Sequence, residues 1–143
     1  MLYTIGYENS SFEDIATKLN NLDVKQLIDV REIPLSRKKG FSKAYLCKNL
    51  PNFGISYIHL KELGSPAHLR QKLHKDKNYK YFFREYYNYL NTQREILKEL
   101  HTLIINETSC LMCYEKSAEH CHRLIIGQEI KKINGNGLFV GHI

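Results

Sequence analysis

The stretch Leu111-Met-Cys-Tyr-Glu-Lys-Ser-Ala-Glu-His-Cys-His-Arg123 decides the fold of this 143-residue chain. The apolar run over residues 110–113 predicts the end of a buried strand, and a polar loop follows over residues 115–119. A helix is then expected from His120 to about Lys132. In open α/β sheets, ligands bind beyond the carboxyl ends of strands and beside helix N-termini. We therefore expect a site at this strand-to-helix turn.

Strand and helix patterns alternate along the rest of the chain. The predicted strands cover residues 2–5, 26–30, 55–60, 109–114 and 138–140. The predicted helices cover residues 11–21, 42–50, 66–76 and 79–91, with another after Thr92 and the one that begins at His120. Such alternation predicts an α/β fold, a three-layer sandwich with a mostly parallel five-stranded sheet. The length favours one domain over residues 1–143.

Capping and breaking residues set the expected ends of these elements. Ser10 with Glu13, and Thr92 with Glu95, match the capping-box spacing at a helix start. Pro51 is expected to stop the helix over residues 42–50, and a turn is expected over residues 134–137.

The charge balance is basic, with a formal net charge of +6. A basic chain favours anionic partners such as nucleic acid, nucleotides or phosphorylated metabolites. A composition rich in Lys, Asn, Ile and Tyr also arises without selection for binding, so both readings stay open. No segment resembles a secretory leader or a membrane span, so we expect a cytoplasmic protein with no membrane partner.

The four cysteines are Cys47, Cys110, Cys113 and Cys121. In a reducing cytoplasm they are expected to be free, metal-bound or catalytic rather than paired in disulfides. Cys110 and Cys113 are three positions apart in a predicted strand, so they should point to opposite faces of the sheet.

Several motifs occur in an order that resembles one known family. They are Thr4-Ile5-Gly6, Asp29-Val30-Arg31 with Pro34 and Ser36, Tyr57-x-His59-Leu60-x-Glu62-Leu63-Gly64, and Cys113-x-Glu115-Lys116-(x)4-Cys121-His122-Arg123. Together they resemble the prokaryotic family called domain of unknown function 488, over essentially the whole chain. Tyr7 departs from the pattern, because the family usually has His after the Gly. The resemblance implies an α/β fold and an enzyme, but no established reaction.

A weaker resemblance concerns the segment over residues 27–32, which is similar to the start of a rhodanese domain. Rhodaneses and Cys-based phosphatases also place a thiolate after a strand and an Arg at the next helix. The spacing between Cys113 and Arg123 is too long for the phosphatase loop, so this likeness is analogy alone.

The residue types around the turn suggest chemical roles. Cys121 or Cys113 is the candidate nucleophile, because a thiol near a helix N-terminus, Arg and His has a lowered pKa. Glu115 or His122 is the candidate acid or base. The candidate anion-binding residues are Arg31, Arg37, Lys116 and Arg123. The supporting residues are Asp29, which could orient an imidazole or bind a ribose hydroxyl, and His59 and Glu62.

Each of these roles has a structural alternative. Cys113 could be an inert buried thiol, and His59 a core histidine with its hydrogen bonds satisfied. Arg123 could pair with Asp29 or Glu115 and hold the helix on the sheet. No cofactor is expected, and zinc is a minor alternative, with Cys113, Cys121 and one of His120 or His122 as ligands. Adjacent residues on a helix point about 100° apart, so a helical run over residues 120–122 would not readily share one metal.

These observations favour an enzyme with a Cys/His/Glu/Arg pocket, a thiol- or carboxylate-dependent transferase or hydrolase. Its substrate would carry phosphate: a nucleotide, a nucleic acid or a related metabolite. The alternative is a non-catalytic nucleic-acid or nucleotide-binding module with structural cysteines.

Overall fold

A computed structural model describes residues 1–135 and 137–143 of the chain. Within these residues five strands form one sheet, in the order β3-β2-β4-β1-β5, and every pairing is parallel. The strands are β1 (Leu2–Gly6), β2 (Gln26–Asp29), β3 (Ser56–His59), β4 (Ser109–Cys113) and β5 (Val140–His142). The predicted α/β class and the parallel five-stranded sheet are confirmed.

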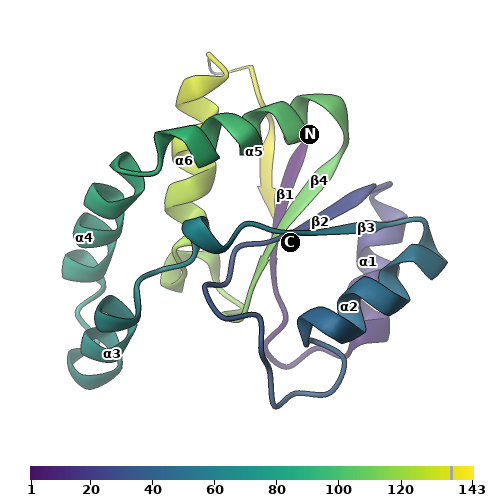
Figure 1. Cartoon of the computed structure of the whole chain (residues 1–143), viewed down its shortest axis with the longest axis horizontal. Helices are drawn as coiled ribbons and strands as arrows, with labels where there is room; N and C mark the ends of the chain where they lie inside the picture. The colour runs from purple at the N-terminus through teal and green to yellow at the C-terminus, as the bar shows by residue number, and fades with distance from the viewer. Residues whose placement is uncertain (136) are drawn as a thin grey trace.

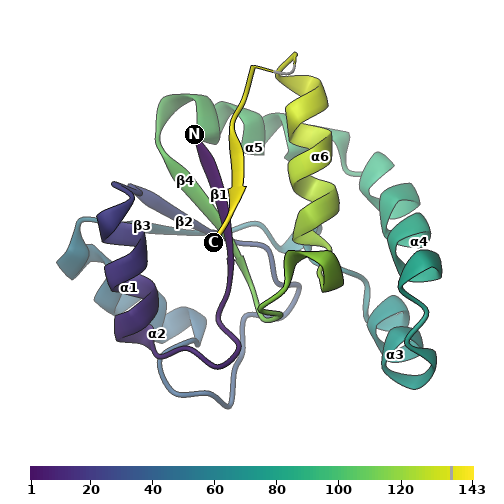
Figure 2. The same ribbon diagram turned by 180° about the vertical axis from the view of Figure 1, so that it is seen from behind.

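Helices cover both faces of the sheet (Figure 1). The α-helices are α1 (Phe12–Asn21), α2 (Lys43–Asn49), α3 (Ala67–Asp76), α4 (Tyr79–Asn91), α5 (Arg94–Asn106) and α6 (Arg123–Ile133). Short 3-10 turns are η1 (Leu50–Phe53), η2 (Lys61–Leu63) and η3 (Ala118–His120). Figure 2 shows α1 and α2 on one side of the sheet and α4, α5 and α6 on the other.

Two apolar cores fill the space between the layers. On one face, Leu27 and Ile5 of the strands pack with residues of α1 and α2. On the other face, Ile28 and Leu111 pack with residues of α4, α5 and α6. Neighbouring residues therefore enter opposite cores, because side chains alternate along a strand. Cys110 and Cys113 also separate in this way, as the strand pattern predicts.

The predicted helix starts are wrong at two positions. Ser11, and not Ser10, caps α1: its hydroxyl accepts from the Asp14 N–H at 3.1 Å, and the Asp14 carboxylate accepts from the Ser11 N–H at 3.2 Å. Thr92 belongs to the end of α4 and donates its hydroxyl to the Tyr89 carbonyl, so it does not cap α5. A hydroxyl can bond to the turn before it or to the turn after it, and spacing alone does not distinguish these uses.

Other boundaries also differ from the predicted ones. Pro51 lies in the first turn of η1, which continues directly from α2, because Pro lacks only an N–H that this position leaves unpaired. α6 begins at Arg123 and not at His120, since η3 and an extended Cys121 precede it. β5 begins at Val140, after the predicted start at residue 138. The predicted turn over residues 134–137 includes residue 136, which lies outside the described residues.

No helix of residues 1–135 or 137–143 is long and apolar enough to cross a membrane.

Candidate active site

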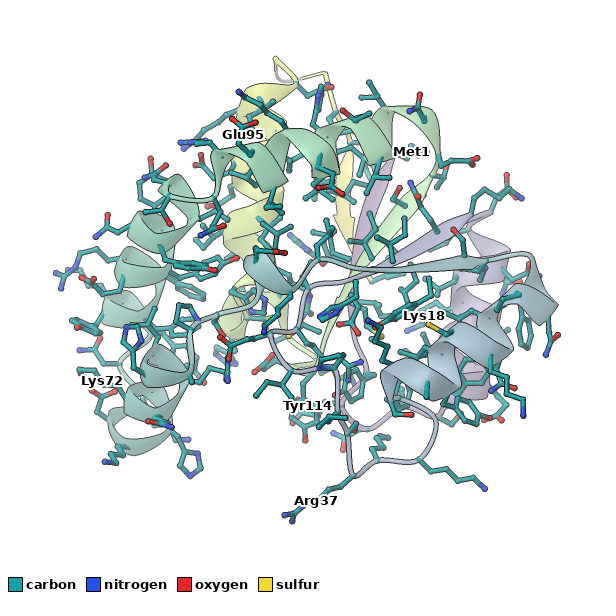
Figure 3. The ribbon with its side chains drawn as sticks, viewed as in Figure 1. Met1, Lys18, Arg37, Lys72, Glu95 and Tyr114 are labelled. Atoms are coloured by element: carbon teal, nitrogen blue, oxygen red, sulfur yellow. The ribbon has the colours of Figure 1, made fainter. Side chains whose placement is uncertain are left out.

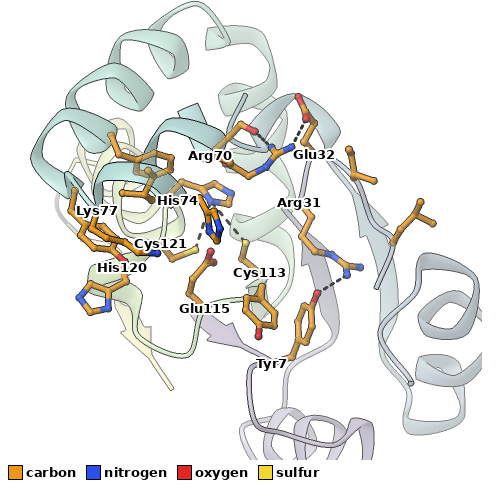
Figure 4. Close-up of a pocket in the computed structure, with 18 residues that line it drawn as sticks. Tyr7, Arg31, Glu32, Arg70, His74, Lys77, Cys113, Glu115, His120 and Cys121 are labelled. Carbon is orange, nitrogen blue, oxygen red and sulfur yellow. Dashed lines mark hydrogen bonds and ion pairs between the residues drawn. The ribbon is translucent and has the colours of Figure 1, made fainter. Parts of the chain in front are cut away.

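A cavity of about 450 Å³ lies beyond the carboxyl ends of β1, β2 and β4 (Figure 4). The chain leaves β2 toward α2 on one face, and it leaves the adjacent β4 toward α6 on the other. Strand ends that diverge in this way open a crevice, which is where α/β folds bind ligands. Helices α3 and α4 supply the outer wall, through side chains such as His74 and Phe82.

Two thiols and an imidazole meet at the base of the cavity. Cys113 is the last residue of β4, and Cys121 and His122 lie between η3 and α6. The Nδ1 atom of His122 is 3.6 Å from Cys121 Sγ and 3.9 Å from Cys113 Sγ. All three residues are almost fully buried. We call Cys113, Cys121 and His122 the thiol–imidazole cluster.

The backbone of β2 fixes the orientation of the His122 ring. Nε2 of His122 lies 2.8 Å from the carbonyl oxygen of Val30. Because a carbonyl can only accept, this nitrogen carries a proton and donates it. Nδ1 is then directed at the two sulfurs. The edge of the buried Tyr86 ring packs against the imidazole, with the ring centres 5.1 Å apart.

The charges of the cluster are strongly coupled. Burial acts to raise the pKa of Cys121, but hydrogen bonding to Cys113 and the nearby His122 and Arg123 lower this pKa well below its ordinary value. Burial acts to lower the pKa of His122, and the Cys121 thiolate more than compensates, so that this pKa rises. The pKa of Cys113 is raised, by its hydrogen bond to Cys121 and by burial. These shifts all favour a negative charge on Cys121 beside a positive charge on His122, and a neutral thiol at Cys113.

Glu115 adds a carboxyl group beside this cluster. Burial and the negative charge on Cys121 raise the pKa of Glu115 to about 7. Its Oε2 atom is buried and has no hydrogen-bond partner among the described residues. In Figure 4 the carboxyl group points toward the two labelled cysteines. A buried polar atom without a partner is costly, and such atoms are often found where a ligand binds.

Basic residues of α3 line the outer wall. Arg70, His74 and Lys77 all line the cavity. Arg70 forms an ion pair with Glu32 at 2.9 Å and donates to the Ser65 carbonyl. His74 and Lys77 are exposed and form no ion pair with any residue that the structure describes. The cavity therefore has the thiol–imidazole cluster at its bottom and basic side chains along its outer wall.

The Asp29–Arg31 motif forms a buried ion pair at the edge of the cavity. The guanidinium of Arg31 donates from Nε to Oδ1 of Asp29 at 2.9 Å and from Nη2 to Oδ2 at 2.6 Å. Its Nη1 donates to the Tyr7 hydroxyl at 3.1 Å. Arg31 lines the cavity and Asp29 does not. The buried carboxylate of Asp29 thus holds Arg31, and neither orients an imidazole nor faces a ribose site.

Arg123 does not line the cavity, although the sequence suggests it as an anion clamp. Its guanidinium donates to the carbonyl oxygens of Glu115, at 2.5 Å, and Lys116, at 2.9 Å. It is 1 % exposed, so no anion reaches it. These hydrogen bonds from Arg123 hold the loop after β4 in place. The expected partners of Arg123 were the carboxylates of Asp29 or Glu115, but the observed partners are backbone carbonyls.

The remaining predicted site residues lie away from the cavity. Arg37 is exposed and extends outward from its loop (Figure 3). Lys116 and Glu62 are also exposed and are not among the lining residues. His59 hydrogen-bonds through Nε2 to the Arg31 carbonyl at 2.7 Å, so it supports the turn after β2. The side chains of Arg37, His59, Glu62 and Lys116 therefore do not line the cavity that contains the thiol–imidazole cluster.

One family model matches residues 11–130, and its description is Domain of unknown function DUF488. The chain belongs to this family. No curated protein and no solved structure matches the chain. The family assignment agrees with the resemblance of the sequence motifs, and it carries no reaction, so the chemistry of this DUF488 protein has to be argued from its own residues.

The cluster of this DUF488 protein also forms a set of potential metal ligands. The two Sγ atoms and one His122 nitrogen lie within 4.8 Å of one another. The sequence argument against a shared metal assumed a helix over residues 120–122. Cys121 is instead extended, with φ −138° and ψ 143°, so its side chain and that of His122 converge. His120 is not part of this group; its ring stacks on Tyr79 with centres 4.7 Å apart.

Sequence reasoning missed the α3 wall of the DUF488 site. A signal was present, because Arg70, His74 and Lys77 follow each other at spacings of four and three residues, which places them on one face of a helix. Nothing in the sequence shows that this face turns toward the ends of β2 and β4. That placement depends on the packing of α3 against α4.

Proposed function

We propose that this DUF488 protein is an enzyme that transfers or hydrolyses a group of a phosphate-bearing substrate. The observation that carries the proposal is the single cavity that combines the thiol–imidazole cluster and Glu115 with the basic residues of α3. A pocket of this size suits a nucleotide, a nucleic-acid end or a related metabolite. We also propose a cytoplasmic location, where the four free cysteines would stay reduced.

The anion of the substrate would bind along α3. Lys77 and His74 are free of ion pairs within the described chain, and Arg70 has one partner, Glu32, on the same wall. A phosphate has more negative charge than one carboxylate, so it would compete well for these donors. These residues replace Arg37, Lys116 and Arg123 as anion-binding candidates.

The bond-making step would take place at the base of the cavity. The sulfur of Cys121 is suited to be either a nucleophile or a metal ligand. In both chemistries a proton has to be taken up or released next to the sulfur. The proposal gives this proton transfer to Glu115, whose buried Oε2 atom has no hydrogen-bond partner among the described residues.

The alternative is a non-catalytic binding module, and the near-complete burial of Cys113 and Cys121 favours it. In such a module the thiols pack the base of the cavity, while Arg70, His74 and Lys77 bind the ligand. The two functions differ in the role of Glu115. In the enzyme Glu115 transfers a proton during turnover, whereas a binding module has no turnover.

A substrate screen with two variants tests the proposal. Nucleotides, sugar phosphates and short oligonucleotides are incubated with the protein, and products are detected by mass spectrometry. We expect Glu115→Gln to lower kcat by at least about a hundredfold while Kd changes little. We expect Arg70→Ala with Lys77→Ala to raise KM and Kd by about tenfold or more. Lys75→Ala is the matched control, because it removes an exposed charge from α3 outside the cavity.

Binding without turnover would overturn the enzyme and leave the binding module. Binding that is unchanged in the Arg70→Ala/Lys77→Ala variant would overturn both functions.

A further inference from the structure

We infer that Cys113, Cys121 and His122 are the protein ligands of a zinc-like divalent cation whose fourth coordination position opens into the cavity. The site is a separate claim from catalysis. Only the role of its fourth position rests on the proposed function.

The two sulfur–nitrogen distances in the cluster match a tetrahedral site. Zinc bonds of ~2.3 Å to sulfur and ~2.0 Å to nitrogen imply ligand separations of ~3.6 Å from sulfur to nitrogen and ~3.8 Å between sulfurs. Nδ1 of His122 is 3.6 Å and 3.9 Å from the two sulfurs, and all three ligand atoms lie within 4.8 Å. The two sulfur–nitrogen distances therefore suit a tetrahedral cation, and the sulfur–sulfur separation is bounded only by the 4.8 Å limit.

The His122 ring is held as metal-binding histidines usually are. Such histidines donate their second N–H to a carbonyl or a carboxylate, which fixes the ring and leaves the other nitrogen for the metal. The Nε2 contact with the Val30 carbonyl at 2.8 Å supplies this bond. The remaining nitrogen, Nδ1, is directed at the two sulfurs, and hydrophobic packing of the ring alone does not explain this orientation.

The surroundings of the sulfurs support the same conclusion. Cys113, Cys121 and His122 are 6 %, 1 % and 4 % exposed, so water does not solvate the cluster freely. The ligand set of two Cys and one His is known for catalytic zinc, which keeps one position for water or substrate. All three residues line the cavity together with Glu115, so the open position faces the substrate space.

The fourth position also gives Glu115 a defined task. Cys113, Cys121 and His122 would hold the cation, which would polarise a water at the open position for the proposed hydrolysis. Glu115, with an unpartnered Oε2 atom on the same cavity, would accept a hydrogen bond from that water. The thiolates would then remain ligands throughout the reaction.

The first test measures metal directly, without a substrate. The full chain is produced in zinc-supplemented medium, and zinc is quantified by mass spectrometry after extensive dialysis. We expect about one zinc per chain, and in a cobalt-substituted sample we expect the visible absorption of tetrahedral cobalt with thiolate ligands. His122→Gln and Cys121→Ser should bind zinc at least about tenfold more weakly. His120→Gln is the matched control, because His120 stands beside the cluster without belonging to it.

A second measurement covers the case in which these variants do not fold. The wild-type protein is stripped with a chelator, and alkylation of each cysteine is followed with and without added zinc. We expect zinc to slow the alkylation of Cys113 and Cys121 by at least about tenfold and to leave the exposed Cys47 unaffected.

Absence of zinc, absence of the cobalt spectrum and equal alkylation rates would overturn the metal site while leaving a thiolate nucleophile for the proposed enzyme. A bound metal with no turnover on any phosphorylated compound would instead overturn the enzyme and leave the metal site.

Discussion

At the scale of single residues, Arg123 shows how one buried side chain can hold a loop through the carbonyl oxygens of its backbone. Its charge is buried, and its donors are directed to carbonyl oxygens of the loop after β4 and to the Thr4 hydroxyl. The planar guanidinium of Arg presents its N–H donors in a rigid fork, which matches two carbonyl oxygens at once. The ammonium group of Lys is a single point charge on a flexible stem and lacks this fork. Arg123 is therefore a positioning residue for Glu115.

Arg123→Lys should lower the free energy of unfolding by about 2 kcal/mol, because the hydrogen bonds to one or both carbonyls are lost. Urea unfolding followed by circular dichroism measures this change. Arg84→Lys, at an exposed position on α4, is the control and should change stability little. A loss for Arg123→Lys as small as that of the control would show that the carbonyl contacts do not hold the loop.

At the scale of elements, the start of α1 depends on which of two adjacent serines is the cap. Ser11 and Asp14 form the reciprocal hydrogen bonds, whereas the Ser10–Glu13 spacing in the sequence is equally suitable. The buried residues of α1 are Phe12, Ile15, Ala16 and Leu19, at helical spacing.

Ser11→Ala should cost about 1 kcal/mol of stability, because the helix loses its capping acceptor. Ser10→Ala is the neighbouring control and should be close to neutral. Thermal or urea unfolding of the two variants decides between the two capping boxes. Equal effects, or a larger effect at Ser10, would contradict the observed cap.

The pairing of β5 with β1 brings His142 beside Thr4, with 2.6 Å between Nδ1 and the hydroxyl oxygen. Partial burial and the positive charge of Arg123 lower the pKa of His142 below its ordinary 6.5, with Cys121 opposing them weakly. The unfolded chain then binds this proton more readily than the folded one. The contribution of His142 to stability is therefore present above a pH of about 6.5 and is lost as the pH falls toward the folded pKa.

His142→Gln should accordingly flatten part of the pH dependence of stability. Unfolding curves at pH values from about 7.5 to about 5.5 should show a smaller loss in the variant than in the wild type. Parallel profiles would mean that His142 titrates alike in the folded and the unfolded chain.

At the scale of the whole molecule, the site depends on two segments that are distant in sequence and nearly touch in space. A Cβ atom added at Gly6, the last residue of β1, would lie 1.7 Å from the carbonyl oxygen of Glu115. Only the absence of a side chain lets the loop after β4 cross the end of β1. Gly6 therefore determines how deep Glu115 sits in the cavity.

Gly6→Ala should destabilise the protein by about 3 kcal/mol, since the backbone atoms in contact cannot move as a flexible side chain would. Gly137→Ala is the matched control, because the nearest atom to its added Cβ in the described part of the chain, adjoining residues aside, is 3.9 Å away. Thermal unfolding of both variants measures the difference. A Gly6→Ala protein as stable as the control would mean that the loop has another position of equal energy.

The sequence predicts the base of the site better than its wall. Cys113, Glu115, Cys121 and His122 follow one strand within a few residues, and strand ends of a parallel sheet share an edge. Arg70 and Lys77 reach the same cavity only through the packing of α3 against α4, which has no local signature. The role of Arg123 also has no signature in the sequence. Its hydrogen-bond partners are backbone carbonyl oxygens, which every residue has.

The central place of β4 has a consequence for how the chain folds. β1 and β2 are synthesised early, yet neither is the other's neighbour, because β4 lies between them. Their facing edges stay open until residues 109–113 arrive, and such distant pairings form slowly. Nascent chains that stall before residue 109 should therefore expose two unpaired apolar strand edges and aggregate. The cavity cannot form earlier, because part of its lining, from Cys113 to His122, belongs to β4 and the segment after it.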